Sequence, residues 1–312
     1  MENQKLLSLT RTVLEQPTAP FHEERVAAEI LAQLAQCPHV TAERDDFGNI
    51  IAHYRRGNAE ARYAFAAHMD HPGWVAGHFL GSVPPEYLRE PQTKNFGDFA
   101  MWDLPPFELR DGQIHSRACD DLIGCVTILA MFQWLEEANT ECACAGIFTR
   151  AEEVGFVGAI KLAQAARLSK TLTIISLETS AERPPARMGD GPIVRVGDRT
   201  SIFDSAATAA LTNIAVKNEI AVQRCLMSGG TCEATAYQLY GYTSAALCIA
   251  LGNYHNCGPE QKIASEFVSV SDLENFVKLC VAVARETSAP ADATIALRER
   301  IEANVEKFRA YF

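Results

Sequence analysis

Residues 145–178 of this chain read AGIFTRAEEVGFVGAIKLAQAARLSKTLTIISLE. An apolar run over residues 145–149 is followed by a segment with helical spacing over residues 155–166 and by a second apolar run over residues 171–177. Strands that alternate with helices are typical of α/β proteins, in which helices cover both faces of a sheet. The stretch therefore predicts a strand, a helix and a second strand of one such sheet.

The same alternation continues on both sides of this stretch. Within a helical segment at residues 22–36, Val26, Ile30 and Leu34 recur at every fourth position and give the helix one apolar face. Further helices are predicted over residues 4–15, 122–135, 205–217, 234–240 and 270–284, and further strands over residues 40–44, 49–54, 62–67, 220–225 and 244–251. We expect a three-layer α/β/α fold with a central, mostly parallel (mixed) sheet and a short β-rich insertion.

The insertion is predicted at residues 71–118, where the alternation stops. This segment holds six of the fourteen prolines, and glycines and aromatic residues are also dense in it. Proline lacks a backbone donor and disfavours long central strands, so we expect irregular structure or β-hairpins here. The predicted organisation is one discontinuous main domain, residues 1–70 and 119–312, interrupted by residues 71–118.

Composition and charge exclude some classes of partner. The 312 residues carry a formal net charge of −11, and the sequence pI is about 5.3. An acidic surface repels nucleic acid and anionic membranes, so neither is expected as a partner. The N-terminus lacks the basic start and apolar run of a signal peptide, and no stretch approaches the roughly 18 to 20 apolar residues of a membrane span. A cytoplasmic location is therefore expected.

Ten cysteines are scattered along the chain, and no CxxC pair occurs. A disulfide framework is not expected in a chain of this length without a secretion signal. We expect most of the thiols to be buried and to pack as small hydrophobic groups. A thiolate metal site at Cys142 and Cys144, which alternate along a predicted strand, is the lesser alternative.

Histidine and carboxylate side chains stand at the ends of five predicted elements. They are His68 and Asp70, Asp120, Glu152 and Glu153, Glu178, and His255. Because ligands of open α/β sheets bind at the carboxyl ends of the strands, we expect these side chains to converge. Imidazole and carboxylate are ligands that zinc and similar divalent ions accept, and a carboxylate can bridge two ions. The set therefore favours a metal site.

Two neighbouring pairs suggest a division of roles. Residues two apart on a strand point the same way, so Asp70 can hold the second ring nitrogen of His68 and fix its tautomer. In an extended segment the side chains of Glu152 and Glu153 diverge, so that one can bind metal while the other faces the substrate as a general base. Each signal alone has a plainer explanation, since an aspartate pair before a helix is commonly an N-cap and adjacent glutamates are usually solvated. The ordered set is what points to a metal site.

Short motifs recur along nearly the whole chain. After an opening segment at residues 7–24 they are Asp46-Phe-Gly-Asn-Ile50, His68-Met-Asp70, Cys119-Asp-Asp121 with Ile123-Gly124, Glu152-Glu-Val-Gly155 with Gly158-Ala159, Met188-Gly-Asp-Gly-Pro192, Ser228-Gly-Gly-Thr231 and Tyr254-His255. In this order the motifs resemble those of the deblocking or glutamyl aminopeptidases, the family that includes enzymes forming tetrahedral particles. More broadly the chain resembles the co-catalytic di-zinc exopeptidases and deacylases.

The resemblance implies a metal-dependent aminopeptidase that hydrolyses N-terminal residues from short peptides. It implies that His68 and Glu178 bind one metal ion, that Glu153 and His255 bind a second, that Asp120 bridges the two, that Asp70 orients His68, and that Glu152 passes a proton from the metal-bound water to the leaving amine. The implied cofactors are two divalent ions, with zinc expected and cobalt or manganese as alternatives. Glu233 and Tyr254 are expected to contact the substrate, whose free α-amine Glu233 or Glu152 could hold.

Three features depart from the family's pattern. Glu178 stands where the family often has aspartate, which implies an adjusted geometry because related di-zinc enzymes also use glutamate. Cys232 and Glu233 follow the Gly-Gly-Thr motif, where the family has aspartate, so the substrate preference is left open. The 49 residues between Asp70 and Asp120 are fewer than the family's β-domain usually has, so the cap is expected to be reduced.

Two other functions are compatible with the same residues. A deacylase or amidohydrolase could use this metal site on N-acyl amino acids, and a catalytically inactive protein could use the fold for binding alone. The intact base, bridging carboxylate and histidines argue against the inactive form.

The expected assembly is a small homo-oligomer, a dimer rather than a cage of twelve subunits, because in the caged relatives the β-domain that is reduced here helps to form the particle. Near the C-terminus Ile301, Val305, Phe308 and Phe312 are spaced by four, three and four residues, which predicts an apolar stripe on a helix. The main expectation is that this stripe packs against the chain's own core, and the alternative is a self-complementary dimer contact.

Overall fold

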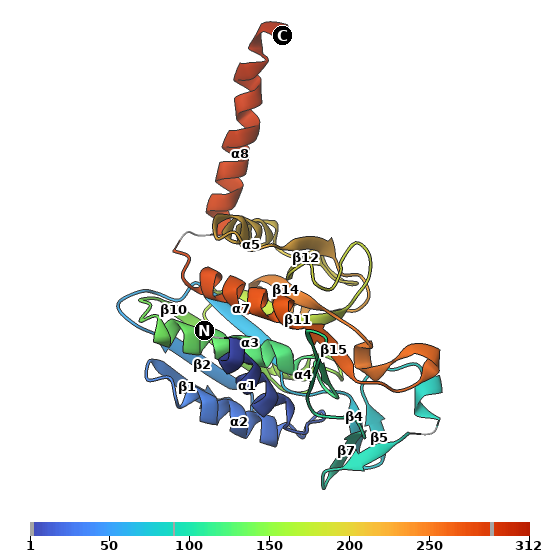
Figure 1. The fold of residues 1–312 in the computed structure, drawn as a ribbon. Helices are drawn as coiled ribbons and strands as arrows, with labels where there is room; N and C mark the ends of the chain where they lie inside the picture. The colour runs from blue at the N-terminus through green and yellow to red at the C-terminus, as the bar shows by residue number, and fades with distance from the viewer. Residues whose placement is uncertain (1–2, 90, 288–289) are drawn as a thin grey trace.

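The main body of the protein is built on one eight-stranded sheet (Figure 1). The computed structural model describes residues 3–89, 91–287 and 290–312. The strand order is β1-β2-β10-β3-β11-β14-β12-β13. Their bounds are β1 Val40–Arg44, β2 Ile50–Arg55, β3 Tyr63–His68, β10 Ala143–Thr149, β11 Thr173–Ala181, β12 Ile193–Gly197, β13 Gln223–Leu226 and β14 Thr243–Leu251.

The centre of the sheet is parallel and its margins are mixed. Strands β10, β3, β11 and β14 run in the same direction as their neighbours in this group, whereas β2 lies antiparallel to β10 and β12 antiparallel to β14. The expected α/β class and mixed sheet are confirmed. Because parallel strands end at one edge of a sheet, residues that follow β3, β10, β11 and β14 are brought together there.

Helices cover both faces of this sheet. Helices α1, α2, α3, α5 and α7 share one hydrophobic cluster with the sheet, and α4 and α6 share another on the opposite face. Along β3 the side chains alternate between the clusters, since Ala64 and Ala66 belong to one and Phe65 and Ala67 to the other. The helix bounds are α1 Asn3–Leu14, α2 Glu24–Leu34, α3 Leu122–Glu137, α4 Val157–Gln164, α5 Ser205–Lys217, α6 Glu233–Leu239 and α7 Val270–Ala284.

The segment at residues 71–118 forms short β-hairpins, as its composition predicts. Its strands are β4 Gly73–Val75, β5 His78–Leu80, β6 Thr93–Asn95, β7 Phe99–Trp102, β8 Glu108–Arg110 and β9 Gln113–Ser116, with a 3-10 turn η1 at Pro85–Leu88. The first four strands form a small sheet in the order β5-β4-β7-β6. Strands β8 and β9 form a second small sheet with β15, Glu266–Ser269, which comes from the far end of the chain.

A last helix, α8 at Pro290–Lys307, projects away from the body, and a 3-10 turn η4 at Arg309–Tyr311 follows it (Figure 1). Its lower end lies beside α5. The apolar stripe predicted near the C-terminus is exposed at all four positions. The expectation that this stripe packs against the chain's own core is therefore wrong, because the helix leaves the body instead of lying on it.

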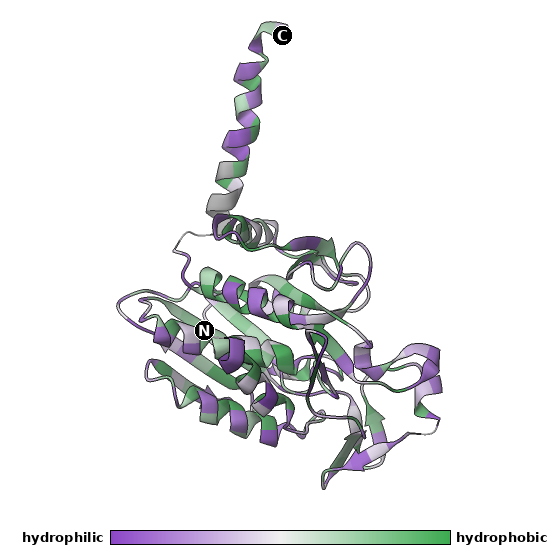
Figure 2. Ribbon diagram, in the orientation of Figure 1, coloured by the Kyte–Doolittle hydropathy of each residue, from purple (hydrophilic) through white to green (hydrophobic). Residues whose placement is uncertain are grey.

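The hydropathy colouring in Figure 2 follows this arrangement, with apolar residues along the central strands and a mixture of polar and apolar residues along α8. Nine of the ten cysteines are buried, Cys257 is partly exposed, and all ten are free thiols. The prediction that most of the thiols are buried is confirmed. Among the described helices, none has the length and apolar character needed to span a bilayer.

Candidate metal centre

Besides Tyr254, six of the predicted site residues line one cavity of about 390 Å³ at the carboxyl edge of the sheet. His68 is the last residue of β3, and Glu178 lies near the end of β11. The loops after β10 and β14 and the segment before α3 supply the others, which are Glu152, Glu153, His255 and Asp120. The predicted convergence is therefore found in the structure.

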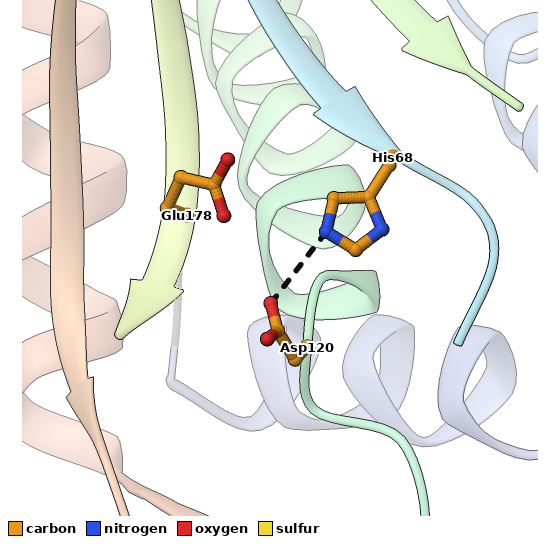
Figure 3. A group of neighbouring side chains, drawn as sticks. All are labelled: His68, Asp120 and Glu178. Atoms are coloured by element: carbon orange, nitrogen blue, oxygen red, sulfur yellow. Dashed lines mark ion pairs between the residues drawn. The ribbon is translucent and has the colours of Figure 1, made fainter. Parts of the chain in front are cut away.

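One cluster in this cavity consists of His68, Asp120 and Glu178, shown in Figure 3. One potential ligand atom from each residue lies within 4.8 Å of the other two. His68 Nε2 lies 3.6 Å from Asp120 Oδ1. All three side chains are buried, so the cluster is a candidate site for a divalent cation.

A second cluster shares the same aspartate. His255 Nε2 lies 3.6 Å from Asp120 Oδ2 and 3.3 Å from Glu153 Oε1. One potential ligand atom from each of these three residues lies within 4.8 Å of the other two. Asp120 thus presents one carboxylate oxygen to each histidine. A carboxylate placed in this way can bridge two cations.

The chemistry of these donors fits a metal ion. Asp120 Oδ1 and Glu153 Oε1 are buried and have no hydrogen-bond partner among the described residues. Burying a carboxylate oxygen without a partner is costly, and a bound cation removes that cost. Although burial lowers the pKa of His68, the surrounding carboxylates, Glu152 foremost, raise it well above its ordinary value. The cavity therefore carries an excess of negative charge for a cation to balance.

Glu152 stands next to both clusters. Its Oε2 lies 4.0 Å from His68 Nε2. His68, Glu152 and Glu153 form a third group, in which one potential ligand atom from each residue lies within 4.8 Å of the other two. Burial raises the pKa of Glu152 well above its ordinary value, and the neighbouring carboxylates Glu178 and Glu153 raise it further. The adjacent glutamates are thus both close enough to the histidines to act in the site.

The Glu152-Glu153 pair lies in a turn, not in the extended segment that we expected. The carbonyl of Glu152 accepts hydrogen bonds from the N–H groups of Gly155 at 2.8 Å and Phe156 at 2.9 Å. Asp70 fixes the turn from the other side, because its Oδ1 accepts from Glu152 N–H at 2.9 Å and its Oδ2 from Glu153 N–H at 3.1 Å. The turn therefore aims both glutamates at the cavity.

Asp70 also lies beside His68, as the sequence predicts. Its Oδ1 is 3.6 Å from His68 Nδ1, and the backbone carbonyl of Asp70 is closer to the same nitrogen, at 3.1 Å. With Nδ1 donating to this carbonyl, Nε2 is left free to face Asp120 and a cation. Asp70 thus positions the imidazole of His68 as well as Glu152 and Glu153.

The β-hairpin segment reaches into the site. His255 lies in a 3-10 turn, η2 at Tyr254–Asn256, and its Nδ1 is 2.6 Å from the backbone carbonyl of Ser82. Ser82 follows β5 and lines the cavity. The ring of Tyr254 stacks on that of His255 with centroids 3.8 Å apart, and Tyr254 also lines the cavity.

Two supporting residues were not identified from the sequence. Glu266, at the start of β15, is fully buried, and its carboxylate accepts from the N–H groups of Cys119, Asp120 and His255 at 2.7, 3.0 and 2.8 Å. Burial raises the pKa of Glu266 to about 7. His71 Nδ1 lies 2.7 Å from the carbonyl of Asp120. The position of His71 directly after His68-Met-Asp70 could have drawn attention to it, whereas nothing near Glu266 marks that residue.

Glu233 is the predicted residue that the structure does not place in the cavity. It is 1% exposed at the start of α6 and does not line the cavity wall. Burial raises its pKa to about 7. Its carboxylate is thus enclosed in this structure, and a contact between Glu233 and the substrate stays a prediction.

Three arginines that the sequence did not single out also line the cavity, Arg183, Arg195 and Arg199. Arg195, on β12, is 3% exposed and donates from Nη1 to Ser180 Oγ at 3.2 Å, while its Nε has no hydrogen-bond partner among the described residues. Arg199 donates to the carbonyl of Gly229. The part of the cavity wall that these arginines form therefore suits an anionic group.

Comparison with known proteins places the chain among aminopeptidases. A sequence model described as M42 glutamyl aminopeptidase matches residues 91–279, which is more than half of the chain. Two curated relatives carry the name "Putative aminopeptidase". The one from Acetivibrio thermocellus is 26% identical over 60% of this chain and 56% of its own length, so the match spans little more than half of that protein. FrvX from Escherichia coli strain K12 is 25% identical over 80% of this chain and 88% of its own length.

Solved structures share the fold. The TET1 peptidase of Pyrococcus horikoshii, which can assemble into a tetrahedron or a large octahedral shell, superposes with a TM-score of 0.73 at 22% identity, covering 90% of this chain and 99% of that one. An aminopeptidase from the archaeon Desulfurococcus kamchatkensis superposes with a TM-score of 0.75 at 20% identity, covering 93% of this chain and 97% of that one.

Proposed function

The chain belongs to the M42 glutamyl aminopeptidase family, and on this premise we propose that it is a metal-dependent aminopeptidase that removes N-terminal residues from short peptides. The observation that carries the proposal is the position of Asp120, whose two carboxylate oxygens each face a different histidine. An arrangement of this kind supports a pair of cations that act on one substrate.

We assign the site residues as follows. His68 and Glu178 hold one divalent ion, Glu153 and His255 hold a second, and Asp120 contacts both. Zinc is the proposed metal, with cobalt and manganese as alternatives that the same ligands accept. Bound ions of this kind polarise a scissile carbonyl and lower the pKa of water.

The remaining site residues transfer a proton, hold the two glutamates in place or contact the substrate. We assign Glu152 as the general base that takes a proton from the attacking water and delivers it to the amine that leaves, since its carboxylate lies beside both clusters without being required by either. Asp70 keeps Glu152 and Glu153 in place through their backbone N–H groups. Tyr254 forms part of the wall against which the substrate lies.

The substrates that fit the cavity best begin with an acidic residue and have a free α-amine. The carboxylates of the metal centre attract the ammonium group, and the arginines that line the cavity attract an acidic side chain. Arg183 and Arg199 support this assignment, since both are exposed side chains that line the cavity and can reach a substrate carboxylate. The name of the family model is consistent with this preference.

A substrate panel combined with metal analysis tests the proposal. The protein reconstituted with zinc should hydrolyse glutamyl and aspartyl p-nitroanilides, and acetylation of the substrate's α-amine should abolish turnover. Faster turnover of the acetylated compounds would favour a deacylase of N-acyl amino acids instead. No turnover of any compound at full metal occupancy would leave a catalytically inactive binding protein as the explanation.

We propose further that residues 71–118 form a reduced cap on a discontinuous catalytic domain of residues 1–70 and 119–312, and that the assembly is a small oligomer. The short hairpins of the cap support this, because they offer little surface for a cage. A cytoplasmic location is also proposed, since ten free cysteines suit a reducing compartment.

A further inference from the structure

We propose that Glu23, a buried glutamate outside the cavity, is a positioning residue: it fixes the turn that carries the proposed base Glu152 and the proposed ligand Glu153. The proposal rests on the roles assigned above to these two glutamates. It starts from the observation that Glu23 is 0% exposed, does not line the cavity and directs its carboxylate at the backbone of the turn.

The turn presents four successive backbone N–H groups, and a side-chain oxygen accepts from each of them. Asn49 Oδ1 accepts from the first, at Arg150, over 3.0 Å. Glu23 Oε1 accepts from the second, at Ala151, also over 3.0 Å. The third and fourth donate to the two oxygens of Asp70. Three segments that are far apart in the sequence thus fix one turn, and Glu23 supplies the contact directly before the proposed base.

Ala151 is the residue of the turn whose conformation depends most on such a contact. Its φ of 54° lies in the left-handed region, which is unfavourable for a residue with a Cβ. A residue other than glycine keeps this conformation only where its surroundings impose it. The Ala151 N–H donates to Glu23, and its carbonyl accepts from Val157 N–H at 3.1 Å. Without the bond to Glu23, we expect residue 151 to relax toward negative φ and the two glutamates that follow it to change direction.

The Glu23 carboxylate is itself fixed at both oxygens. Its Oε1 also accepts from Phe21 N–H at 2.8 Å, and its Oε2 accepts from Arg150 Nε at 2.6 Å. The same guanidinium donates to the carbonyls of Phe21 and Phe47, each at 2.9 Å. Arg150 therefore connects the chain before α2 and the loop before β2 to the residue that precedes Ala151. These contacts leave the Glu23 carboxylate one position, from which it can fix the turn.

The burial of Glu23 has no local explanation. The residue stands at the N-cap position of α2, yet within the described part of the chain its side chain makes no capping hydrogen bond. The ion pair with Arg150 is weak evidence for a role in stability, since the cost of removing two charges from water can exceed their attraction. Two of the three hydrogen bonds that compensate the buried carboxylate come from residues 150 and 151. The contacts of Glu23 are therefore directed at the turn and not at its own helix.

Zinc titration and steady-state kinetics on Glu23→Gln test the proposal. The comparison is made at pH 8, above the pKa of about 7 to which burial raises Glu23. With zinc saturating, kcat for a glutamyl p-nitroanilide should fall about 10-fold to 100-fold because Glu152 is displaced, whereas KM should change little. The dissociation constant of zinc should rise about 10-fold to 100-fold, because Glu153 moves with the same turn.

Asp272→Asn is the matched control. Asp272 is also 0% exposed, and its carboxylate accepts from the backbone N–H groups of Gly189 and Gly191 at 2.7 and 2.9 Å. Neither glycine lines the cavity. The control variant should lose stability but keep the kcat and the zinc dissociation constant of the wild type.

Two further variants test the route through the backbone. Glycine adopts the φ of 54° at position 151 without strain, so Ala151→Gly in the Glu23→Gln background should recover part of the lost kcat. Arg150→Lys keeps the positive charge but loses the forked contact with the carbonyls of Phe21 and Phe47, so it should lower kcat with KM unchanged. This second variant decides the question if Glu23→Gln does not fold.

Either an unchanged kcat or an unchanged zinc dissociation constant in a folded Glu23→Gln protein would overturn the proposal. A loss of kcat that Asp272→Asn reproduces would overturn it as well, because destabilisation alone would then explain the effect. The zinc titration needs no substrate. It therefore decides the role of Glu23 even if the wild type hydrolyses no aminoacyl p-nitroanilide, a result that would refute the proposed function instead.

Discussion

Asp120 and the two glutamates opposite it show how much the site depends on single atoms. The two oxygens of Asp120 face different histidines, so loss of this carboxylate affects both proposed cation positions at once. Glu152 and Glu153 are neighbours in sequence, receive the same support from Asp70 and both lie near His68. Only Glu153 also belongs to the cluster around His255, and this difference is the basis for assigning it as the ligand.

Substitution within the glutamate pair tests that assignment. Glu152→Gln should keep the metal content of the wild type and lose about 10² to 10⁴ in kcat, the loss expected when a positioned base is removed. Glu153→Gln should lose metal first and activity as a consequence. Elemental analysis and steady-state kinetics on both variants separate the two roles, and the opposite pattern would exchange them.

The arginines should determine selectivity between substrates. Arg199→Gln and Arg183→Gln should each lower kcat/KM for a glutamyl substrate about 10-fold to 100-fold, as expected for one hydrogen bond to a charged group. The rate for a leucyl substrate should change little. Arg187→Gln, at an exposed position outside the cavity lining, is the matched control. Equal losses on both substrates would show that the arginines do not read the side chain.

At the scale of elements, two short strands bring distant segments into contact. Strand β15 pairs with β9 in a register that sets Glu266 opposite Ser116. The Glu266 carboxylate therefore reaches the N–H groups at Cys119 and Asp120 just before α3, and also the N–H of His255 after β14. One side chain on a four-residue strand thus sets the distance between the shared aspartate and a histidine.

Glu266→Gln should weaken the contact between the residue 266 side chain and the N–H groups of Cys119, Asp120 and His255. The amide group replaces one acceptor with a donor that faces a backbone N–H, and a buried unmatched polar group costs about 1 to 3 kcal/mol of unfolding free energy. Metal affinity should fall about 10-fold to 100-fold, as is typical when a group that orients ligands is lost. Denaturation and metal titration measure the two effects. Glu260→Gln, on an exposed turn, should change neither.

How much the sequence predicts differs between elements. The strands that contain or precede His68, Glu153 and Glu178 were predictable because each includes a buried apolar run with a histidine or a carboxylate at or after its end. Strand β12, Ile193–Gly197, was not predicted, since it is short and directly follows the Gly-Asp-Gly-Pro motif. The role of Glu266 was not predictable for a different reason: it depends on pairing between strands about 150 residues apart, which local patterns do not encode.

On the scale of the whole molecule, the notable property is the number of buried acids. Burial raises the pKa of Glu23 to about 7 and that of Glu178 to about 8. Glu23 lies outside the metal site and contacts Arg150 Nε at 2.6 Å, yet burial outweighs the effect of this arginine on its pKa. Part of the molecule's stability must therefore depend on pH.

Glu23→Gln should reveal this dependence. A carboxyl whose pKa is raised by folding takes up more protons in the native state than in the unfolded chain between its ordinary pKa of about 4.5 and about 7. Its stabilising contribution is full below this window and is lost as the pH rises through it. The unfolding free energy of the metal-free wild type, relative to Glu23→Gln, should thus decrease between pH 5 and pH 8. Urea denaturation at both pH values measures the difference, and a constant or increasing difference would contradict the raised pKa.

The bond between His255 Nδ1 and the carbonyl of Ser82 limits how the protein can be redesigned. A loop-grafting experiment that shortens the segment between β5 and η1, or replaces it with a longer domain from a relative, must deliver a backbone carbonyl to the same point. This bond places no demand on the side chain at position 82, because it uses the main chain. Evolution can therefore change the sequence of this loop readily while its path is held constant by an imidazole more than 170 residues away.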